Sequence, residues 1–187
     1  MEDKLVVAVL AGTSREGRKS INAARYVADF ASKLPNVEAL FADPAEFNFP
    51  YDGDNEDTRD ARYTELTARA DAFYIVTPEY NHSIPGSLKR MLDSEFENYY
   101  HKPVAFGGVS NGNWGGTRVC EALLPVAHTM GMPVIKTELY FPRVQDLFDE
   151  QGQLKPEHVE RYEANLHKAF DELLLFARLF KSARQTA

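Results

Sequence analysis

The fold is decided by the opening stretch LVVAVLAGTSREGRKSINAARYVADFASKL, residues 5–34. Its first part, Leu5 to Leu10, is a continuous aliphatic run, which is typical of a strand covered on both faces. The run stops at a polar loop from Gly12 to Ser20, and Ser20 is placed to cap a following helix. That helix is predicted from apolar residues at helical spacing: Ile21, Ala24, Val27, Ala28, Ala31 and Leu34. The chain therefore opens with a strand, a polar loop and a helix.

The rest of the chain continues this alternation. Further strands are predicted at Val37 to Phe41, Ala72 to Val76, Pro103 to Gly107 and Met132 to Ile135. Helices are predicted at Thr58 to Ala70, Ser83 to Asp93, Val119 to Met130 and Pro156 to Lys181. Thr77-Pro78 is expected to end the third strand, because proline cannot donate to the pairing. Ser83 is expected to cap its helix, and the Pro- and acid-rich stretch Asp43 to Asp57 is predicted to be a surface loop.

This alternation predicts one α/β domain over residues 1–187. Parallel strands need helical crossovers, and right-handed crossovers place helices on both faces of the sheet. Five such strands fit a doubly wound parallel sheet with the order 2-1-3-4-5. Ligands of such sheets bind beyond the carboxyl ends of the strands, where the winding reverses. The loops that reach this point follow the first, third and fourth strands.

Composition limits the possible functions. The chain has 187 residues, 44% of them hydrophobic, which is enough for a core without a disulfide or metal. Its formal net charge of −7 argues against a wide nucleic-acid interface. No window approaches the ~20 apolar residues of a membrane span, and no signal-like segment opens the chain, so a cytoplasmic location is expected. The single Cys120 is expected to pack in or near the core, and the histidines lack metal-ligand spacing, so no metal site is predicted.

The loop from Gly12 to Ser20 is suited to an anion. It supplies backbone N–H groups at a helix N-terminus, hydroxyls on Thr13, Ser14 and Ser20, and the guanidinium of Arg15. Taken alone, the same loop also fits a solvated turn whose Ser20 only caps the helix. The composition therefore leaves both interpretations open.

The same loop nearly matches the phosphate-binding pattern G-x-x-x-x-G-K-[ST]. Gly12 and Gly17 are correctly separated, but Arg18 stands between Gly17 and Lys19. The dinucleotide pattern G-x-G-x-x-G is absent. A nucleotide-phosphate enzyme using this near-match is one alternative function.

The other two loops carry groups that suit a planar heterocycle. Thr77 to Lys89 offers the flat ring of Tyr80 and the amide of Asn81, although packing and a simple turn explain these residues equally well. Ser110 to Gly116 contains glycines that permit close backbone approach. Within it, Trp114 either covers a ligand or a partner surface, or is buried.

Three motifs together resemble the NADPH-dependent FMN reductase family, a flavodoxin-like group that includes quinone, azo and chromate reductases. The motifs are Gly12-Thr13-Ser14-Arg15 with Ser20-Ile21-Asn22, the segment Thr77-Pro78-Glu79-Tyr80-Asn81-His82-Ser83-Ile84-Pro85-Gly86-Ser87-Leu88-Lys89, and Ser110-Asn111-Gly112 with Gly115-Gly116-Thr117-Arg118. The resemblance spans about Lys4 to Ile135, and Pro78 to Asn81 is its most specific part.

The resemblance implies a set of cofactor-binding residues. It implies that Thr13, Arg15, Ser20 and Asn22 hold the FMN phosphate, that Pro78 to Asn81 line the isoalloxazine, and that Ser110 to Gly112 approach its other edge. The full predicted set is Thr13, Ser14, Arg15, Ser20, Ile21, Asn22, Pro78, Glu79, Tyr80, Asn81, Ser110, Asn111, Gly112 and Gly115.

Two departures from the family pattern bear on this set. The first loop has Thr13 where the family often has serine, and between Arg15 and Ser20 it is two residues longer than the short form of the family. The longer loop leaves two candidates for the phosphate contact, Arg15 and Arg18. Asn113-Trp114 stand in the third loop where small residues are common, which would narrow the substrate opening.

The function implied by the resemblance is an FMN-dependent oxidoreductase. It would pass hydride from NAD(P)H through bound FMN to a quinone, azo compound, metal oxyanion or free flavin by a ping-pong mechanism. The flavin performs the chemistry, so no catalytic side chain is assigned, and Glu79 is expected to orient rather than act as a base. A separate hypothesis is that His82 influences the proton delivered to a reduced quinone. The resemblance also implies a homodimer or homotetramer. An alternative is an electron carrier for a protein partner, although such carriers typically lack an arginine like Arg15 in the first loop.

Overall fold

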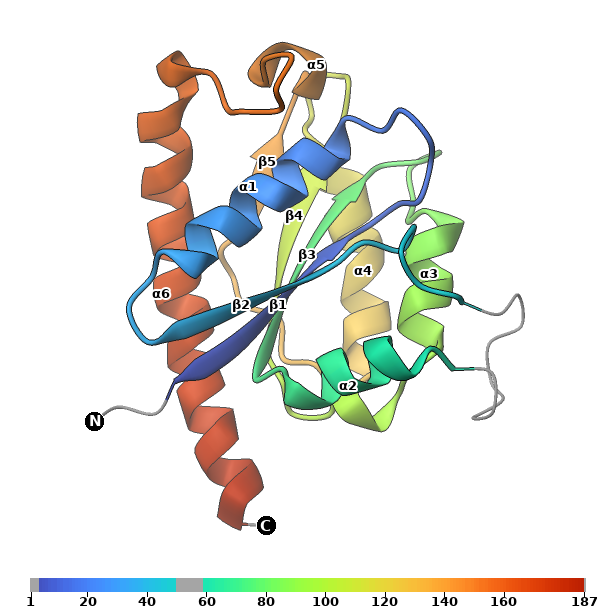
Figure 1. The fold of residues 1–187 in the computed structure, drawn as a ribbon, viewed down its shortest axis with the longest axis vertical. Coiled ribbons are helices and arrows are strands. Elements are labelled where there is room, and N and C mark those ends of the chain that lie inside the picture. Colours follow the sequence, from blue (N-terminus) through green and yellow to red (C-terminus); the bar gives the residue numbers. More distant parts are fainter. Residues whose placement is uncertain (1–3, 50–58, 187) are drawn as a thin grey trace.

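The computed structural model, which describes residues 4–49 and 59–186, contains a five-stranded parallel sheet with helices on both faces (Figure 1). The strand order is β2-β1-β3-β4-β5, which confirms the predicted flavodoxin-like topology. The strands are β1 Leu5–Ala11, β2 Val37–Ala42, β3 Ala72–Pro78, β4 Val104–Val109 and β5 Leu139–Phe141. The helices are α1 Ser20–Ser32, α2 Ala61–Arg69, α3 Gly86–Asp93, the 3-10 helix η2 Glu97–Tyr99, α4 Thr117–Thr129, α5 Val144–Leu147 and α6 Pro156–Thr186.

The sheet separates two apolar layers. Alternate residues of β1 point to opposite faces, as the pleat of a strand requires. Val7 and Val9 join the layer under α1 and α6, whereas Ala8 and Leu10 join the layer under α2, α3 and α4. Both faces of β1 are thus covered, and this is why its sequence is a continuous aliphatic run.

The fifth strand is not where the sequence predicted it. Met132 to Ile135 forms only a bridge between Val134 and Val104, and the strand is Leu139–Phe141, which pairs with the end of β4. The ladder is interrupted because the N–H groups of Lys136 and Thr137 donate to the carboxylate of Glu172 on α6, at 2.9 and 3.0 Å. Burial raises the pKa of Glu172, but these hydrogen bonds outweigh it and leave the pKa below its ordinary value.

Other predicted boundaries were also wrong. Ser20 is the first residue of α1 and not its cap, and Ser83 does not cap α3, which begins after Pro85. By contrast, the predicted end of the third strand at Thr77-Pro78 is confirmed, because β3 ends at Pro78. Pro78 still pairs with Val109, since the neighbouring hydrogen bond is donated by the N–H of Glu79 to the Val109 carbonyl and needs no N–H from the proline. At its far end α6 continues past the predicted Lys181 to Thr186.

The predicted surface loop Asp43 to Asp57 is described only as far as Phe49, and the rest lies outside the described residues. Its first residue is not on the surface, since Asp43 is only 3% exposed. The start predicted for the following helix, Thr58, also lies outside the described residues, and α2 begins at Ala61.

The start of α2 is fixed by Asp60. Its carboxylate accepts hydrogen bonds from the N–H of Arg62 at 3.1 Å and from the N–H of Asn48 at 2.9 Å. The side chain of Arg62 also donates to it, and this bond is the main reason why the pKa of Asp60 is lowered from 3.8 to about 2. Asp60 therefore caps α2 as a carboxylate.

We expect Asp60→Ala to lower the free energy of unfolding by about 1 kcal/mol at pH 7, because the cap is lost. The folded pKa of Asp60 lies below its unfolded value, so its contribution is complete above about pH 4 and is lost as the pH falls toward about 2. Urea unfolding of wild type and variant between pH 7 and pH 2 should show the two curves converging at acid pH. A constant difference across this range would contradict the assignment.

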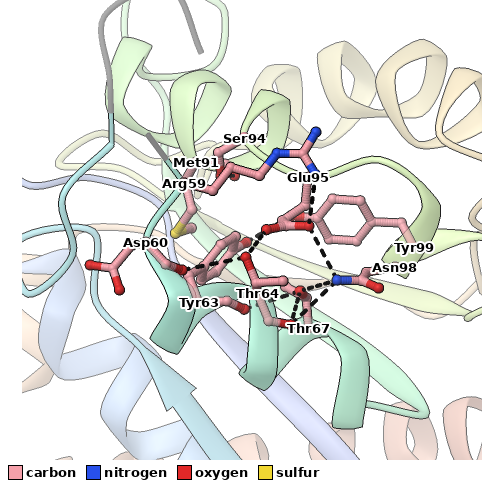
Figure 2. A network of polar contacts seen from close by, with 10 residues as sticks. All are labelled: Arg59, Asp60, Tyr63, Thr64, Thr67, Met91, Ser94, Glu95, Asn98 and Tyr99. Carbon is pink, nitrogen blue, oxygen red and sulfur yellow. Dashed lines mark hydrogen bonds and ion pairs between the residues drawn. The ribbon is translucent and has the colours of Figure 1, made fainter. Parts of the chain in front are cut away.

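A buried polar network joins α2 to the segment that follows α3 (Figure 2). The carboxylate of Glu95, which is 4% exposed, accepts from the hydroxyl of Thr64 and from the amide of Asn98 at 3.1 Å. The hydroxyls of Tyr63 and Tyr99 share a hydrogen bond of 2.7 Å, and burial raises the pKa of both. These contacts fix the layer on which α3 rests.

The last turns of α6 are held at the end of the sheet where the parallel strands begin. The buried carboxylate of Asp71 accepts from the N–H of Val6 at 3.1 Å, from Lys181 at 2.8 Å and from Arg184 at 3.1 Å. Lys181 also donates to the carbonyl of Lys4 at 3.2 Å. These contacts, the Asp71 cluster, lie at the amino-terminal ends of the strands, and the loops that follow β1, β3 and β4 lie at the opposite, carboxyl-terminal ends (Figure 1).

Candidate functional site

A cavity of about 390 Å³ lies at the carboxyl edge of the sheet. It is formed by the three loops that the topology predicts to meet there, those after β1, β3 and β4, with Val144 of α5 at its side. The predicted site residues that line it are Arg15, Ser20, Pro78, Glu79, Tyr80, Ser110 and Asn111. Its volume lies within the range of about 300–1,000 Å³ usual for small-molecule sites.

The first and second loops start close together, because the backbone of Gly12 lies against Thr77. A Cβ atom placed on Gly12 would lie 2.1 Å from Oγ1 of Thr77 and 2.6 Å from its Cα atom. The N–H of Gly12 donates to the carbonyl of Val76 at 2.8 Å, which holds the two strand ends at this separation. Only glycine fits at position 12 without moving the end of β3.

The first loop presents cations and an open helix end. Lys19 occupies the cap position of α1, no side chain of the described chain caps that end, and the first turn contains no acidic residue. The first N–H groups of a helix lack intrahelical partners and attract anions. The guanidinium of Arg15 lies 5.9 Å from the centre of the Tyr80 ring and has no carboxylate partner within residues 4–49 and 59–186. This end of the cavity is suited to a compact anion.

The second loop is a tight turn that presents Tyr80. Tyr80 and Ser83 exchange backbone hydrogen bonds of 3.0 and 2.9 Å, and between them Asn81 and His82 have φ angles of 50° and 63°. Positive φ at both central positions is the geometry of the turns that join antiparallel strands. The hydroxyl of Tyr80 lies 3.3 Å from that of Thr13, which connects this loop to the first.

Glu79 connects the second loop to the third. Its Oε2 accepts from the N–H of Arg118 in the first turn of α4 at 3.2 Å, and its Oε1 lies 3.5 Å from the Arg118 guanidinium. A carboxylate at a helix N-terminus is favoured by the helix dipole. The geometry thus gives Glu79 a role in fixing the start of α4 at the rim of the cavity.

The third loop is held by its own hydrogen bonds. Ser110 donates through Oγ to the carbonyl of Gly112 at 3.0 Å, and its carbonyl accepts from the N–H of Val144 at 3.1 Å. At the end of the loop Gly116 has a φ of 83° and packs on the backbone of Gly108 in β4. Trp114 is 73% exposed, so the interpretation of a buried tryptophan is wrong.

Several predicted residues do not line the cavity. Thr13 is buried beneath Tyr80, and the N–H of Ser14 donates to the hydroxyl of Ser87 at 3.2 Å. Asn22 lies against Gly152, where an added Cβ atom would be 3.0 Å from its Oδ1. The remaining residues of this group are Ile21, Asn81, Gly112 and Gly115.

The structure also adds lining residues. Four of them lie in the predicted anion-binding loop Gly12 to Ser20: Glu16, Gly17, Arg18 and Lys19. The unusual length of this loop was the sequence signal that could have added them to the predicted site. Val144 lies in α5, between Ile135 and Pro156, where the sequence analysis predicts no helix or strand, and nothing in the sequence pattern there points to the site.

Two other predictions concern chemistry outside the cavity. Cys120 is on α4 and is fully buried in the apolar layer between this helix and the sheet, which confirms core packing, and burial raises the pKa of its thiol well above the ordinary value. Among residues 4–49 and 59–186 no group of three or more His, Cys, Asp or Glu side chains is arranged to hold a metal ion. No helix in the described part of the chain is both long and apolar enough to cross a bilayer.

Comparison with known proteins places this site in context. Residues 5–146 match the sequence profile of the family NADPH-dependent FMN reductase. A quinone reductase of Pseudomonas putida is 30% identical over 155 residues, which cover 79% of this chain and 83% of that protein. Among solved structures, the flavoenzyme NAD(P)H:(acceptor) oxidoreductase FerB of Paracoccus denitrificans has a TM-score of 0.74 at 19% identity, covering 92% of this chain and 98% of that one. A flavodoxin, WrbA-like protein of Agrobacterium tumefaciens has a TM-score of 0.55 at 18% identity, covering 98% and 99% of the two chains.

Proposed function

The chain belongs to the NADPH-dependent FMN reductase family, and from this premise we propose that it binds FMN in the cavity of about 390 Å³ and passes hydride from NAD(P)H to a small acceptor. Membership makes it an NAD(P)H-dependent oxidoreductase of the FMN reductase and quinone reductase type. The observation that carries the proposal is the meeting of the three predicted loops around one cavity with a cationic end.

The residues present fit FMN. The N-terminus of α1, the guanidinium of Arg15 and the neighbouring Lys19 form a donor set for a phosphate, and in the described part of the chain no side chain caps that helix end and no carboxylate pairs with Arg15. We assign the phosphate contact to Arg15, because within the described chain Arg18 already has a carboxylate partner, Asp43, and Arg15 has none. Ser20 adds a hydroxyl at the same end of the cavity.

The rest of the cavity suits a flat ring with polar edges. Pro78 and Tyr80 supply a wall from the second loop, and Ser110 and Asn111 supply backbone and side-chain polar groups from the third. Both loops are fixed by their own hydrogen bonds before any ligand binds. A rigid site of this kind binds a rigid ligand with little ordering cost.

Bound FMN would supply the hydride chemistry at its N5 atom. The chain's own residues bind and orient, and Glu79 acts by holding α4 at the rim through Arg118. We propose that donor and acceptor use the same opening in turn, which gives ping-pong kinetics. Quinones, azo compounds, metal oxyanions and free flavin are the proposed acceptors.

We further propose that the protein self-associates and acts in the cytoplasm. Large apolar side chains are exposed on the third loop, on α4 and on the segment that follows α3: Phe96, Tyr100, Trp114 and Leu124. The rings of Phe96 and Tyr100 lie 5.0 Å apart. Light scattering of the purified protein measures the oligomeric state directly, and a monomer at all concentrations would contradict self-association.

The decisive test is spectroscopic. We expect the purified protein to be yellow or to take up added FMN, and its flavin absorbance to bleach rapidly when NADPH is added without oxygen. A flavin that stays oxidised would indicate an electron carrier instead. A protein that binds no FMN but binds ATP would indicate a nucleotide-phosphate enzyme and would contradict the proposal.

A further inference from the structure

Arg18 and Asp43 form an ion pair at the wall of the cavity, in which Asp43 is buried and Arg18 is largely covered. Their side chains are 15% and 4% exposed, and Nη2 of Arg18 contacts Oδ2 of Asp43. Asp43 directly follows β2, and its Oδ1 accepts from the N–H of Ala45 at 3.0 Å, so the carboxylate is itself held in place. The first loop is thereby attached to the end of β2, a strand that contributes no residue to the cavity lining.

The same guanidinium shapes the loop. Nη1 of Arg18 donates to the carbonyl of Arg15 at 3.2 Å, and the N–H of Arg18 points to that carbonyl at 3.4 Å. Between them Gly17 has a φ of 67°, so the chain reverses within four residues. Arg18 thus closes the turn Arg15 to Arg18 from both its backbone and its side chain.

The two arginines of the loop are in different situations. Arg15 is exposed, faces Tyr80 and has no carboxylate partner within the described chain. The charge of Arg18 is balanced by Asp43, and its Nε atom is buried without a hydrogen-bond partner in the described residues. The side chain of Arg18 is therefore held by contacts within the protein, whereas that of Arg15 is available to a ligand.

We propose that Arg18 and Asp43 are a positioning pair that shapes the first loop for the phosphate of FMN. The proposal rests on the proposed function, because it takes FMN as the ligand. A loop already shaped in the free protein loses less freedom on binding, and the affinity for the phosphate rises accordingly. Asp43 contributes to this without lining the cavity.

The test compares FMN with riboflavin, which has the same ring system but no phosphate. Dissociation constants are measured by flavin fluorescence for wild type, Arg18→Gln, Asp43→Asn and the double variant. Each single variant is expected to weaken FMN binding about tenfold, because an unshaped loop must be ordered on binding. Riboflavin binding should change less than about twofold, and the double variant should be no weaker than the singles, because the pair acts as a unit.

A matched control is Asp29→Asn. Asp29 forms an ion pair with Lys33 at the far end of α1, with side chains 60% and 71% exposed. The same change of carboxylate to amide should leave both dissociation constants unchanged. The effect of Asp43→Asn is then not a general effect of lost negative charge.

Other outcomes would overturn the proposal. If Arg18 binds the phosphate directly, Asp43→Asn releases its charge and FMN binds as tightly as before or more tightly, while Arg18→Gln weakens it. An equal loss of riboflavin and FMN affinity would show that the pair only supports the fold.

If these variants fail to fold, Arg18→Lys is the alternative, because it keeps the charge opposite Asp43 and loses the hydrogen bond to the Arg15 carbonyl. If Arg18→Lys prefers FMN over riboflavin as strongly as the wild type does, the proposal is also overturned. A wild-type protein that binds neither flavin would refute the proposed function itself.

Discussion

Replacing Arg15 with alanine is expected to weaken FMN binding by about 10- to 100-fold, since a hydrogen bond to a charged group contributes about 1.5–3 kcal/mol. The side chain of Arg15 is exposed and lies 5.9 Å from the centre of the Tyr80 ring, so its removal takes no buried contact from the described part of the fold. The free energy of unfolding should change by less than about 0.5 kcal/mol. FMN titration and urea unfolding of the same preparation measure both quantities.

The control for this prediction is Arg25→Ala, which removes the same charge from an exposed position on α1 outside the cavity. Its affinity for FMN should equal that of the wild type. Riboflavin should bind Arg15→Ala as it binds the wild type, because the lost contact is to the phosphate. Unchanged FMN affinity in Arg15→Ala would show that the phosphate assignment is wrong.

Gly12→Ala is expected to have the largest effect on the fold. The new methyl group would lie 2.1 Å from Oγ1 of Thr77 and 2.6 Å from its Cα atom, so the ends of β1 and β3 must separate. Overpacking of this kind costs about 3 kcal/mol when backbone has to move. Thermal unfolding should show a clear fall in midpoint, together with weaker binding of FMN and riboflavin alike.

Gly86→Ala is the matched change. Gly86 is the first residue of α3, and nothing lies within 4 Å of an added Cβ atom there. Alanine favours a helix more than glycine does, so this variant should be as stable as the wild type or more stable. Adding Thr77→Gly to Gly12→Ala should restore stability only in part, because the contact with the Cα atom remains. Full stability of Gly12→Ala alone would refute the close contact.

The sequence predicts the sheet well because its signals are local. Leu5 to Leu10 is aliphatic without interruption because both faces of β1 are covered, and that alone separates it from a half-exposed strand. The predicted fifth strand, Met132 to Ile135, has an apolar run too and pairs with Val104, but the N–H groups of Lys136 and Thr137, which would continue the pairing, donate to Glu172, which is distant in sequence. No pattern around Met132 shows this.

The site was predictable at the level of loops and less so for single side chains. The topology brings the loops of Arg15, Tyr80 and Ser110 together, as their positions after strands predicted. Which of the two arginines has a carboxylate partner in the described residues is decided by Asp43, which lies in a stretch with no periodic pattern. Tertiary partners of this kind assign roles to residues that look equivalent in the sequence.

The Asp71 cluster also determines how the protein can be attached to a surface. Because Lys181 contacts both Asp71 and Lys4, the two outer parts of the described chain meet at the amino edge of the sheet, opposite the cavity. An anchor at either place would leave the cavity facing the solution. Electrodes or beads derivatised in this way would hold the molecule in one orientation, with the redox site open to dissolved donors and acceptors.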